Sequence, residues 1–420
     1  MRIIADLHIH SRFSRACSPK LNLSSLEKWA SFKGINLITT ADFTHPKWIK
    51  ECEDQLESCG NGLYKIKGSK KEVFFIFTTE ISFIYKKGDK TRRVHEVVLA
   101  PGLEEAKKLN KELNKRGFNL SSDGRPILGM SDRDFLELIK SIDKGFEIIP
   151  AHIWTPWYAL FGSKSGFDSI KECFGDMSKY IFALETGLSS DPPMNWRLSD
   201  LDDYTLVSNS DSHSLKNIGR EANVLEVDEN KLSYDEIIDI LKKGDKKRFL
   251  YTVEFFPEEG RYHMDGHRKC DVCFNPKKTI KEKGICPKCG KKLTIGVSHR
   301  VNDLADRDLG FKPKKAHGFK KLIQLDKIIA ESIGLKTRNS KKVMKIYRNM
   351  IKGIGSEFYI LLNAPIKKIK ENVGHDKIIE AIKRVRNGNL LIKPGFDGSY
   401  GKVKIFKDNE KNKSKQKDLF

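Results

Sequence analysis

Short apolar segments that end in polar, metal-binding residues recur along the first 250 residues of the chain. Six of them have the length of a β-strand and end at residues 10, 42, 80, 152, 185 and 213. A seventh, residues 93–100, carries its histidine near the beginning. Helix-like stretches such as residues 24–32 and 103–115 lie between these segments. Because strands alternate with helices, the pattern predicts an α/β fold with a mostly parallel sheet.

The polar residues at the segment ends add a further expectation. In β/α barrels the active site lies at the carboxyl ends of the strands. Seven strand-like segments therefore predict a distorted (β/α)7 barrel over residues 1–250. After it we expect a cysteine-rich module at residues 251–315, a basic helical region at residues 316–406 and a disordered tail at residues 407–420.

Charge is distributed very unevenly along the chain. The net charge is +22, of which residues 1–250 contribute +1 and residues 251–420 contribute +21. This asymmetry favours a nearly neutral catalytic half joined to a half that binds a polyanion; the alternative is that the lysines serve only solubility. No long apolar run or signal-like start is present, so we expect a cytoplasmic, nucleoid-associated protein with no membrane partner. The scattered cysteines argue against a disulfide framework.

His8 and His10 form an H-x-H pair on the first predicted strand. Alternate residues of a strand point to the same side, so both imidazoles can bind one ion. Imidazole together with carboxylate suits Zn²⁺, Mn²⁺ or iron better than Mg²⁺ alone. A single H-x-H pair is weak evidence, and the recurrence of such residues in the other segments strengthens it. Glu80 follows a fully apolar run and is the best candidate to bridge two or three divalent ions.

Several of these segments resemble the motifs of the PHP (polymerase and histidinol phosphatase) metallo-phosphoesterases. Residues 6–11 (DLHIHS) resemble the first motif, His152 with the residues before it the fourth, and residues 210–213 (SDSH) the last. Glu80 and His95 match the third motif. The resemblance implies one ion on His8, His10, Glu80 and Asp211, a second on Glu80, His95 and His152, and a third on His213 with residues of the second motif.

The second motif departs from the family pattern. Phe43 stands where the ligand histidine is expected. Asp42 or His45 could replace the missing ligands, so a third ion is an open alternative and two ions are the safer expectation. Paired ions activate a water molecule near neutral pH and neutralise the phosphate in an in-line displacement.

Two pairs of cysteines carry the other strong motif. Cys270 and Cys273 form the first C-x-x-C, and Cys286 and Cys289 form the second after twelve residues. Four thiolates at this spacing predict a structural zinc site without an open position. Many lysines surround the module, which favours contact with nucleic acid; the alternative is a scaffold between barrel and helical region.

A PHP barrel, a four-cysteine zinc module and a basic helical region within 420 residues are similar to the endonuclease Q family. Residues 298–301 (SHRV) and 353–361 (GIGSEFYIL) add to the likeness. The resemblance implies a DNA-repair endonuclease that cuts double- or single-stranded DNA on the 5′ side of deaminated bases (hypoxanthine, uracil or xanthine) and of abasic sites. Composition and spacing alone carry no information on that lesion preference.

Further residues are weaker candidates for substrate contacts. Arg12 and Arg15 could hold phosphate oxygens, and a flipped base needs aromatic walls, for which we select Phe13, Trp154 and Trp157. Trp154 is the first choice because it follows His152 closely. The turn at residues 353–355 (GIG) resembles a phosphate-holding hairpin between helices, and residues 416–420 resemble a truncated peptide that binds the sliding clamp.

Three other functions use some of these features. A small-molecule phosphatase needs the same barrel site but neither the charged half nor the zinc module. A non-catalytic DNA-binding protein would not need a nearly complete set of ligands. A PHP-type exonuclease would degrade DNA from its ends.

Overall fold

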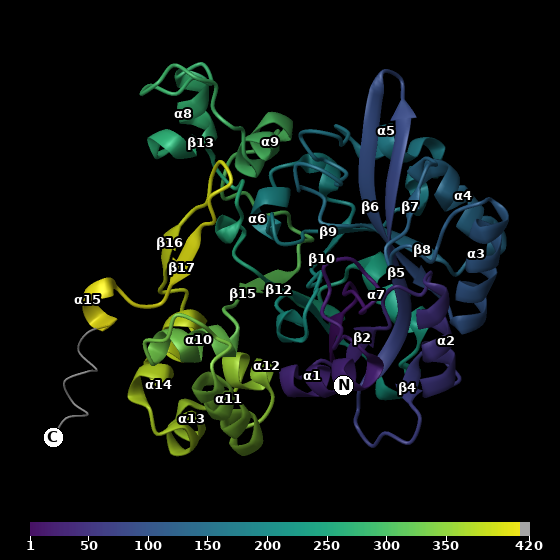
Figure 1. Ribbon diagram of the computed structural model, residues 1–420, viewed down its shortest axis with the longest axis horizontal. Helices are drawn as coiled ribbons and strands as arrows, with labels where there is room; N and C mark the ends of the chain where they lie inside the picture. Colours follow the sequence, from purple (N-terminus) through teal and green to yellow (C-terminus); the bar gives the residue numbers. More distant parts are fainter. Residues whose placement is uncertain (412–420) are drawn as a thin grey trace.

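The computed structural model describes residues 1–411, so the predicted clamp-binding peptide lies outside the described residues. In Figure 1 the barrel, in purple to teal, lies on one side and the C-terminal half, in green to yellow, on the other. Within residues 1–411 no helix is both long and apolar enough to cross a membrane.

An eleven-stranded sheet forms the centre of the molecule. Its strands are β1 (Arg2–Asp6), β2 (Leu37–Thr39), β3 (Leu56–Ser58), β4 (Tyr64–Ile66), β5 (Phe74–Lys87), β6 (Lys90–Ala100), β7 (Ile127–Leu128), β8 (Glu147–Pro150), β11 (Ala222–Glu226), β12 (Phe249–Glu254) and β15 (Gly318–Lys321). The order along its main path is β15-β12-β11-β1-β2-β5-β4-β3. Off this path, β6 and β7 pair with β5, and β8 pairs with β6. A separate parallel pair consists of β9 (Ala183–Glu185) and β10 (Thr205–Val207).

The predicted α/β barrel is confirmed, but its strand directions are mixed. β1, β2 and β5 run parallel, whereas β5 and β6 form a long antiparallel hairpin and β11 runs antiparallel to β1. Gly88, at a φ of 59°, provides the tight turn that lets β6 fold back on β5. At the other side of the ring, the backbone N–H of His10 donates to the carbonyl of Ser212 at 3.0 Å, which joins the end of β1 to the segment after β10.

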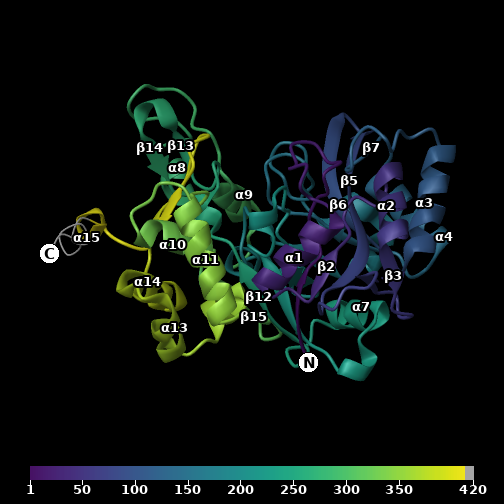
Figure 2. The ribbon, with the colours of Figure 1, turned by 60° about the horizontal axis from the view of Figure 1, so that its bottom comes forward.

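Amphipathic helices cover the outside of the barrel. They are α1 (Leu23–Lys33), α2 (Pro46–Gln55), α3 (Leu103–Lys115), α4 (Asp132–Ile142), α5 (Ile170–Phe174), α6 (Pro192–Asn195) and α7 (Tyr234–Lys243). Figures 1 and 2 show α2, α3 and α4 along one outer side of the sheet. α3, for example, buries Ala106, Leu109 and Leu113 at helical spacing. The side chain of Ser131 accepts a hydrogen bond from the N–H of Asp134 and so caps the start of α4.

The C-terminal half contains two smaller units. The first, the zinc module, comprises β13 (Asp265–His267), β14 (Val272–Phe274) and α8 (Pro276–Lys281), followed by α9 (Val297–Leu304). The second holds α10 (Leu325–Ser332), α11 (Lys341–Gly353), α12 (Glu357–Leu362), α13 (Ile366–Val373), α14 (Asp376–Arg386), β16 (Leu391–Lys393), β17 (Lys402–Lys404) and α15 (Asp408–Lys411). Since β15 pairs with β12, the main sheet continues past residue 250.

The helical unit docks on the barrel through α12. A Cβ atom on Gly34, at the end of α1, would approach Ser356 Oγ to 2.3 Å, and Phe358 is buried in the shared core. The turn at residues 353–355 leads directly into the contact between α12 and the barrel, and its binding of phosphate stays a prediction.

Candidate metal centre and zinc module

The predicted ligands of the first two ions meet at one end of the barrel. His8 and His10 follow β1, Glu80 lies within β5, and His152 follows β8. His95 lies in the middle of β6 and reaches the same end, because β6 runs antiparallel to β5 and His95 pairs with Ser82.

Glu80 belongs to two groups of ligand atoms. Within each group all atoms lie within 4.8 Å of one another; the groups are His8, His10, Glu80 and Asp211, and Glu80, His95 and His152. The Oε2 atom of Glu80 lies 3.0 Å from His10 Nε2, and its Oε1 atom lies 2.6 Å from His95 Nδ1. Each carboxylate oxygen thus faces a different group, which is the arrangement of a carboxylate that bridges two ions.

The donor atoms fit divalent cations. His8 Nδ1 lies 3.0 and 3.1 Å from the two oxygens of Glu185, and since a carboxylate only accepts, Nδ1 carries the hydrogen. In the neutral imidazole, the form that binds a metal ion, Nε2 then carries the lone pair, and this buried atom has no hydrogen-bond partner. Imidazoles together with buried carboxylates are a ligand set for Zn²⁺ or Mn²⁺.

Electrostatics at the centre favours added positive charge. Burial alone would lower the pKa of His8, but the carboxylates of Glu185 and Glu80 raise it well above its usual value. The pKa of His10 is raised in the same way, against its burial, by Asp211 and Asp42. Burial lowers the pKa of His95 to about 4, although Glu80 opposes this effect. The buried carboxylates are thus stabilised by added positive charge, which divalent ions would supply.

A second set of residues orients the ligands. Besides His8, Glu185 accepts hydrogen bonds from the N–H of His152 at 2.8 Å and from Asn209 Nδ2 at 2.8 Å. Asp6 accepts from the N–H groups of Ser210 and Gly219 and so fixes the loop that carries Asp211. Three residues at the centre have positive φ, an uncommon conformation that clusters at functional sites: Asp42 at 42°, His152 at 32° and Asp211 at 44°.

The residues expected at a third ion do not form a third group of ligand atoms within residues 1–411. Asp42 accepts from Ser11 N at 2.7 Å and lies 3.2 Å from His10 Nδ1, so it orients His10. His45 stacks on Phe13 with ring centroids 4.2 Å apart, and His213 lies beside His10 at 4.3 Å. Across residues 1–411, neither His45 nor His213 joins a group of three or more ligand atoms.

The basic residue that reaches the centre is not the one that the sequence suggested. Arg12 pairs with Glu51 and Arg15 is exposed, whereas Arg125 Nη1 lies 2.9 Å from Glu80 Oε2. Arg125 comes from the loop between α3 and β7, which has neither hydrophobic periodicity nor a motif. Gly124 packs so closely against Asp42 that a Cβ there would lie 2.4 Å from its Oδ2. This close approach fixes the loop at the centre.

The expectation that Trp154 contacts a base is wrong. Its side chain is 1% exposed, donates from Nε1 to Asn195 Oδ1 at 2.7 Å and stacks on Phe161. Trp154 is therefore part of the core. Trp157, three residues later, is 42% exposed.

The zinc module has a different ligand set from the predicted four cysteines. The ligand atoms of His267, Cys270, Cys286 and Cys289 lie within 4.8 Å of one another, and Cys273 stands outside this group. In β14, Val272 and Phe274 point into the small core, so Cys273 between them points outward and is exposed. Desolvation opposes ionisation of Cys286, yet the N–H of Lys288 and the imidazole of His267 lower its pKa to about 6. Three cysteines and one histidine fit tetrahedral zinc.

Comparisons with known proteins cover the whole chain. The uncharacterized protein YqxK of Bacillus subtilis (strain 168) is 30% identical over 417 residues, which are 96% of this chain and 99% of that protein. The crystal structure of the lesion-specific endonuclease PfuEndoQ from Pyrococcus furiosus has a TM-score of 0.85 at 30% identity and covers 100% of this chain and 98% of that one. The chain belongs to the endonuclease Q family.

Three further matches cover all or part of the chain. A crystal structure of endonuclease Q with a 27-mer duplex that carries an abasic lesion at its active site has a TM-score of 0.83 at 31% identity and covers both chains fully. The model of the MJ0043 C-terminal domain matches residues 324–389. The uncharacterized protein MJ0043 of Methanocaldococcus jannaschii is 34% identical over 252 residues, which are 60% of this chain but only 31% of that protein.

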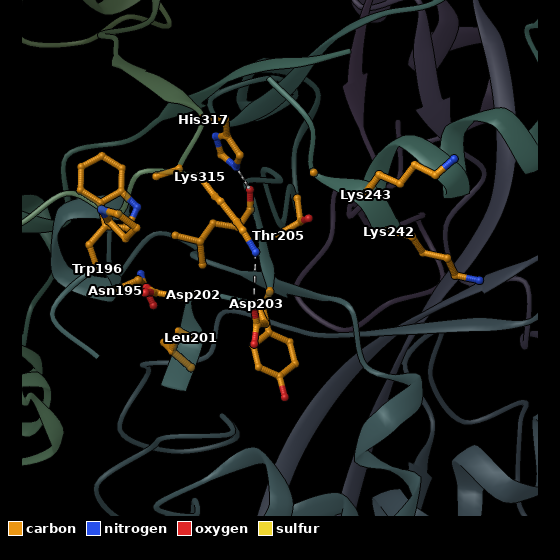
Figure 3. Close-up of a pocket in the computed structure, with 15 residues that line it drawn as sticks. Asn195, Trp196, Leu201, Asp202, Asp203, Thr205, Lys242, Lys243, Lys315 and His317 are labelled. Carbon is orange, nitrogen blue, oxygen red and sulfur yellow. Dashed lines mark hydrogen bonds and ion pairs between the residues drawn. The ribbon is translucent and has the colours of Figure 1, made fainter. Parts of the chain in front are cut away.

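Membership of the endonuclease Q family confirms the predicted fold and the predicted class of enzyme, a metal-dependent nuclease. A separate cavity, drawn in Figure 3, is lined by residues at the start of β10, whereas Asp211 follows the end of that strand. There His317 Nε2 donates to the carbonyl of Leu206 at 2.8 Å, and Lys315 faces Asp203. None of the metal ligands lines this cavity.

Proposed function

We propose that this chain is a DNA-repair endonuclease of the nucleoid that hydrolyses the phosphodiester on the 5′ side of deaminated bases (hypoxanthine, uracil or xanthine) and of abasic sites. The observation that carries the proposal is Glu80, whose two oxygens face two separate groups of metal ligands. The full-length likeness to an endonuclease Q bound to a lesion-bearing duplex supports DNA as the substrate.

The residues of the centre have distinct roles in this proposal. His8, His10, Glu80, Asp211, His95 and His152 would hold two divalent ions, which would supply a nucleophilic hydroxide near neutral pH and neutralise the phosphate. Glu185 accepts from His8 Nδ1, which leaves His8 Nε2, 3.5 Å from Glu80 Oε2, as the atom that would bind an ion. Arg125 is the side chain that we assign to a phosphate oxygen, because a guanidinium donates several hydrogen bonds in one plane and keeps its charge at every physiological pH.

The charge of the C-terminal half supports a nucleic acid partner. Lys/Arg outnumber Asp/Glu there by 21, and the zinc module presents exposed lysines on several elements. Because DNA attracts lysine and arginine through its phosphates, this half is proposed to hold the DNA while the barrel cuts it. Such binding weakens as salt is raised, which a phosphatase acting on a small molecule would not require.

One assay separates the candidate functions. Labelled duplexes with a single uracil, a single hypoxanthine or no lesion are incubated with metal-supplemented enzyme, beside a phosphomonoester. A single nick at the lesion is expected; a ladder would indicate an exonuclease, released phosphate alone a phosphatase, and binding without cleavage a non-catalytic protein. Glu80→Gln should abolish the nick, whereas His375→Gln, a histidine on the distant α14 cap, should retain it.

The sliding clamp is proposed as a second partner, through residues 416–420. A clamp pull-down with the full chain and with a chain that ends at residue 410 tests this: equal capture would exclude the tail as the binding segment.

A further inference from the structure

Three aromatic side chains from distant parts of the chain lie together at the surface. Trp157 follows the metal ligand His152 and is 42% exposed, and Tyr400, 71% exposed, belongs to the glycine-rich turn before β17. Tyr262 lies between them: its ring is 6.0 Å from that of Trp157, and the guanidinium of Arg261 lies 6.0 Å from the ring of Tyr262 and 5.1 Å from that of Tyr400. We call Trp157, Tyr262, Arg261 and Tyr400 the aromatic track.

The aromatic track begins beside the metal centre. Tyr158, the neighbour of Trp157, places its ring 4.8 Å from the ring of His95. Tyr158 has a φ of 61°, an unfavourable conformation for a bulky residue, which the surrounding loop maintains. Trp157 is itself held by a hydrogen bond from Thr155 Oγ1 to its carbonyl at 2.9 Å. The track therefore starts one residue from a side chain that contacts a ligand.

The far end of the track is rigid. Arg261 Nε donates to the carbonyl of Gly398 at 3.1 Å, and the N–H of Gly398 donates to the carbonyl of Arg261 at 3.0 Å. A Cβ on Gly401 would lie 1.9 Å from the carbonyl oxygen of Glu258, so only glycine permits this approach. The backbone that carries Tyr400 is thus fixed beside Arg261, and little backbone entropy is lost when a ligand binds.

We propose that the aromatic track stacks unpaired bases of the DNA strand that extends from the metal centre. Exposed aromatic faces stack on any base, and an arginine between them adds cation–π and phosphate contacts. Paired bases inside a duplex cannot reach such faces, so the track selects a strand that is single or locally unwound. The inference rests on the proposed function, since it takes DNA as the ligand.

Tryptophan fluorescence provides a direct test. The full-length holoenzyme is titrated with an undamaged oligothymidylate and with an undamaged duplex of the same length. Quenching by the single strand is expected; it should disappear in Trp157→Phe while the affinity, measured by anisotropy, remains. Trp157→Leu and Tyr400→Ala should each weaken single-strand binding about tenfold and duplex binding much less.

Tyr180→Ala is the matched control. Tyr180 is 41% exposed and lies beside Lys140 and Lys179, yet it has no place in the track. The proposal is overturned if Tyr180→Ala weakens binding as much as Tyr400→Ala, if duplex and single strand lose affinity equally, or if the quenching persists in Trp157→Phe. An equal loss on duplex would show that these residues contact paired DNA from outside.

The nicking assay keeps this inference separate from the proposed function. If lesion-bearing duplex is cut normally but Trp157→Leu and Tyr400→Ala bind single strands as the parent does, the track fails and the nuclease stands. If the track variants lose single-strand affinity but the parent cuts no lesion, stacking stands and the proposed function fails.

Discussion

The guanidinium of Arg125 donates a hydrogen bond to Oε2 of Glu80, the carboxylate that both groups of metal ligands share. Burial would raise the pKa of Glu80, but His95 and Arg125 hold it well below its usual value. Glu80 therefore stays ionised among the imidazoles. The same contact places the guanidinium of Arg125 at the metal centre, where a phosphodiester must approach.

Arg125→Ala should lower the rate of cleavage about 100-fold, because removing one charge-assisted donor from a preorganised site has an effect of that order. Arg125→Lys should recover only part of the rate, since an ammonium lacks the planar fork. Steady-state kcat and KM on a lesion-bearing duplex measure the effect. Arg116→Ala, which removes a surface arginine paired with Glu112, is the control. If a high metal concentration fully restored the cleavage rate of Arg125→Ala, Arg125 would act only by keeping Glu80 ionised and not on the substrate.

Glu185→Gln should weaken metal binding at least tenfold, because partners that orient a ligand histidine have effects of that size. An amide can accept from His8 Nδ1 through one oxygen only, whereas the carboxylate lies within 3.1 Å through both. Calorimetric titration with Mn²⁺ gives the affinity, and the KM for DNA should stay unchanged. Glu137→Gln, on the surface of α4, provides the comparison. Unaltered Mn²⁺ affinity would rule out this role of Glu185.

A residue of the metal centre can be predicted from the sequence where its neighbours along the chain determine its position. His8 and His10 were predicted because alternation along one strand places both imidazoles on one side. His95 matches the third PHP motif, but its position at the centre follows from the antiparallel course of β6, which no local residue pattern indicates. Arg125 lies in an irregular loop, so its approach to Glu80 arises from tertiary packing alone.

The predicted roles of Trp154 and Cys273 differ from the structure because of which side chains are buried. Trp154 and Trp157 both lie within five residues of His152 in sequence. Packing against Phe161 buries Trp154, whereas Trp157 is exposed. In the zinc module, spacing favoured Cys273, whereas the alternation of buried residues in β14 turns it outward. His267 lies three residues before Cys270, and this H-x-x-C spacing is the sequence signal that indicates it as a ligand.

The zinc module gives a prediction that distinguishes its two ligand sets. Cys273→Ser should keep zinc, and the parent should have one more solvent-reactive thiol than Cys273→Ser, while Cys270→Ser should lose zinc because it removes a member of the assembled group. Zinc content after desalting and thiol titration of the native protein measure both. If Cys273→Ser lost zinc and His267→Ala retained it, the ligands would be the four cysteines that the spacing predicts.

The helical unit is joined to the barrel by a buried ion pair, which leads to a prediction on stability. Lys33 Nζ at the end of α1 lies 2.8 Å from Glu357 Oε2 of α12, and both side chains are less than 5% exposed. Tyr347 Oη and the N–H of Leu325 donate to the same carboxylate. Lys33→Met leaves that buried charge without its cation, which costs about 3–5 kcal/mol in known cases.

Urea unfolding followed by the fluorescence of Trp29 should detect this loss, because Trp29 packs 6.1 Å from Tyr347 at the same contact. The double variant Lys33→Met/Glu357→Gln should recover much of the stability, since the unpaired charge is then removed as well. Lys28→Met, on the exposed face of α1, should change stability by less than about 0.5 kcal/mol. If the double variant were no more stable than Lys33→Met, the loss would come from packing rather than from the stranded carboxylate, and the pair would not be what holds α12 on the barrel.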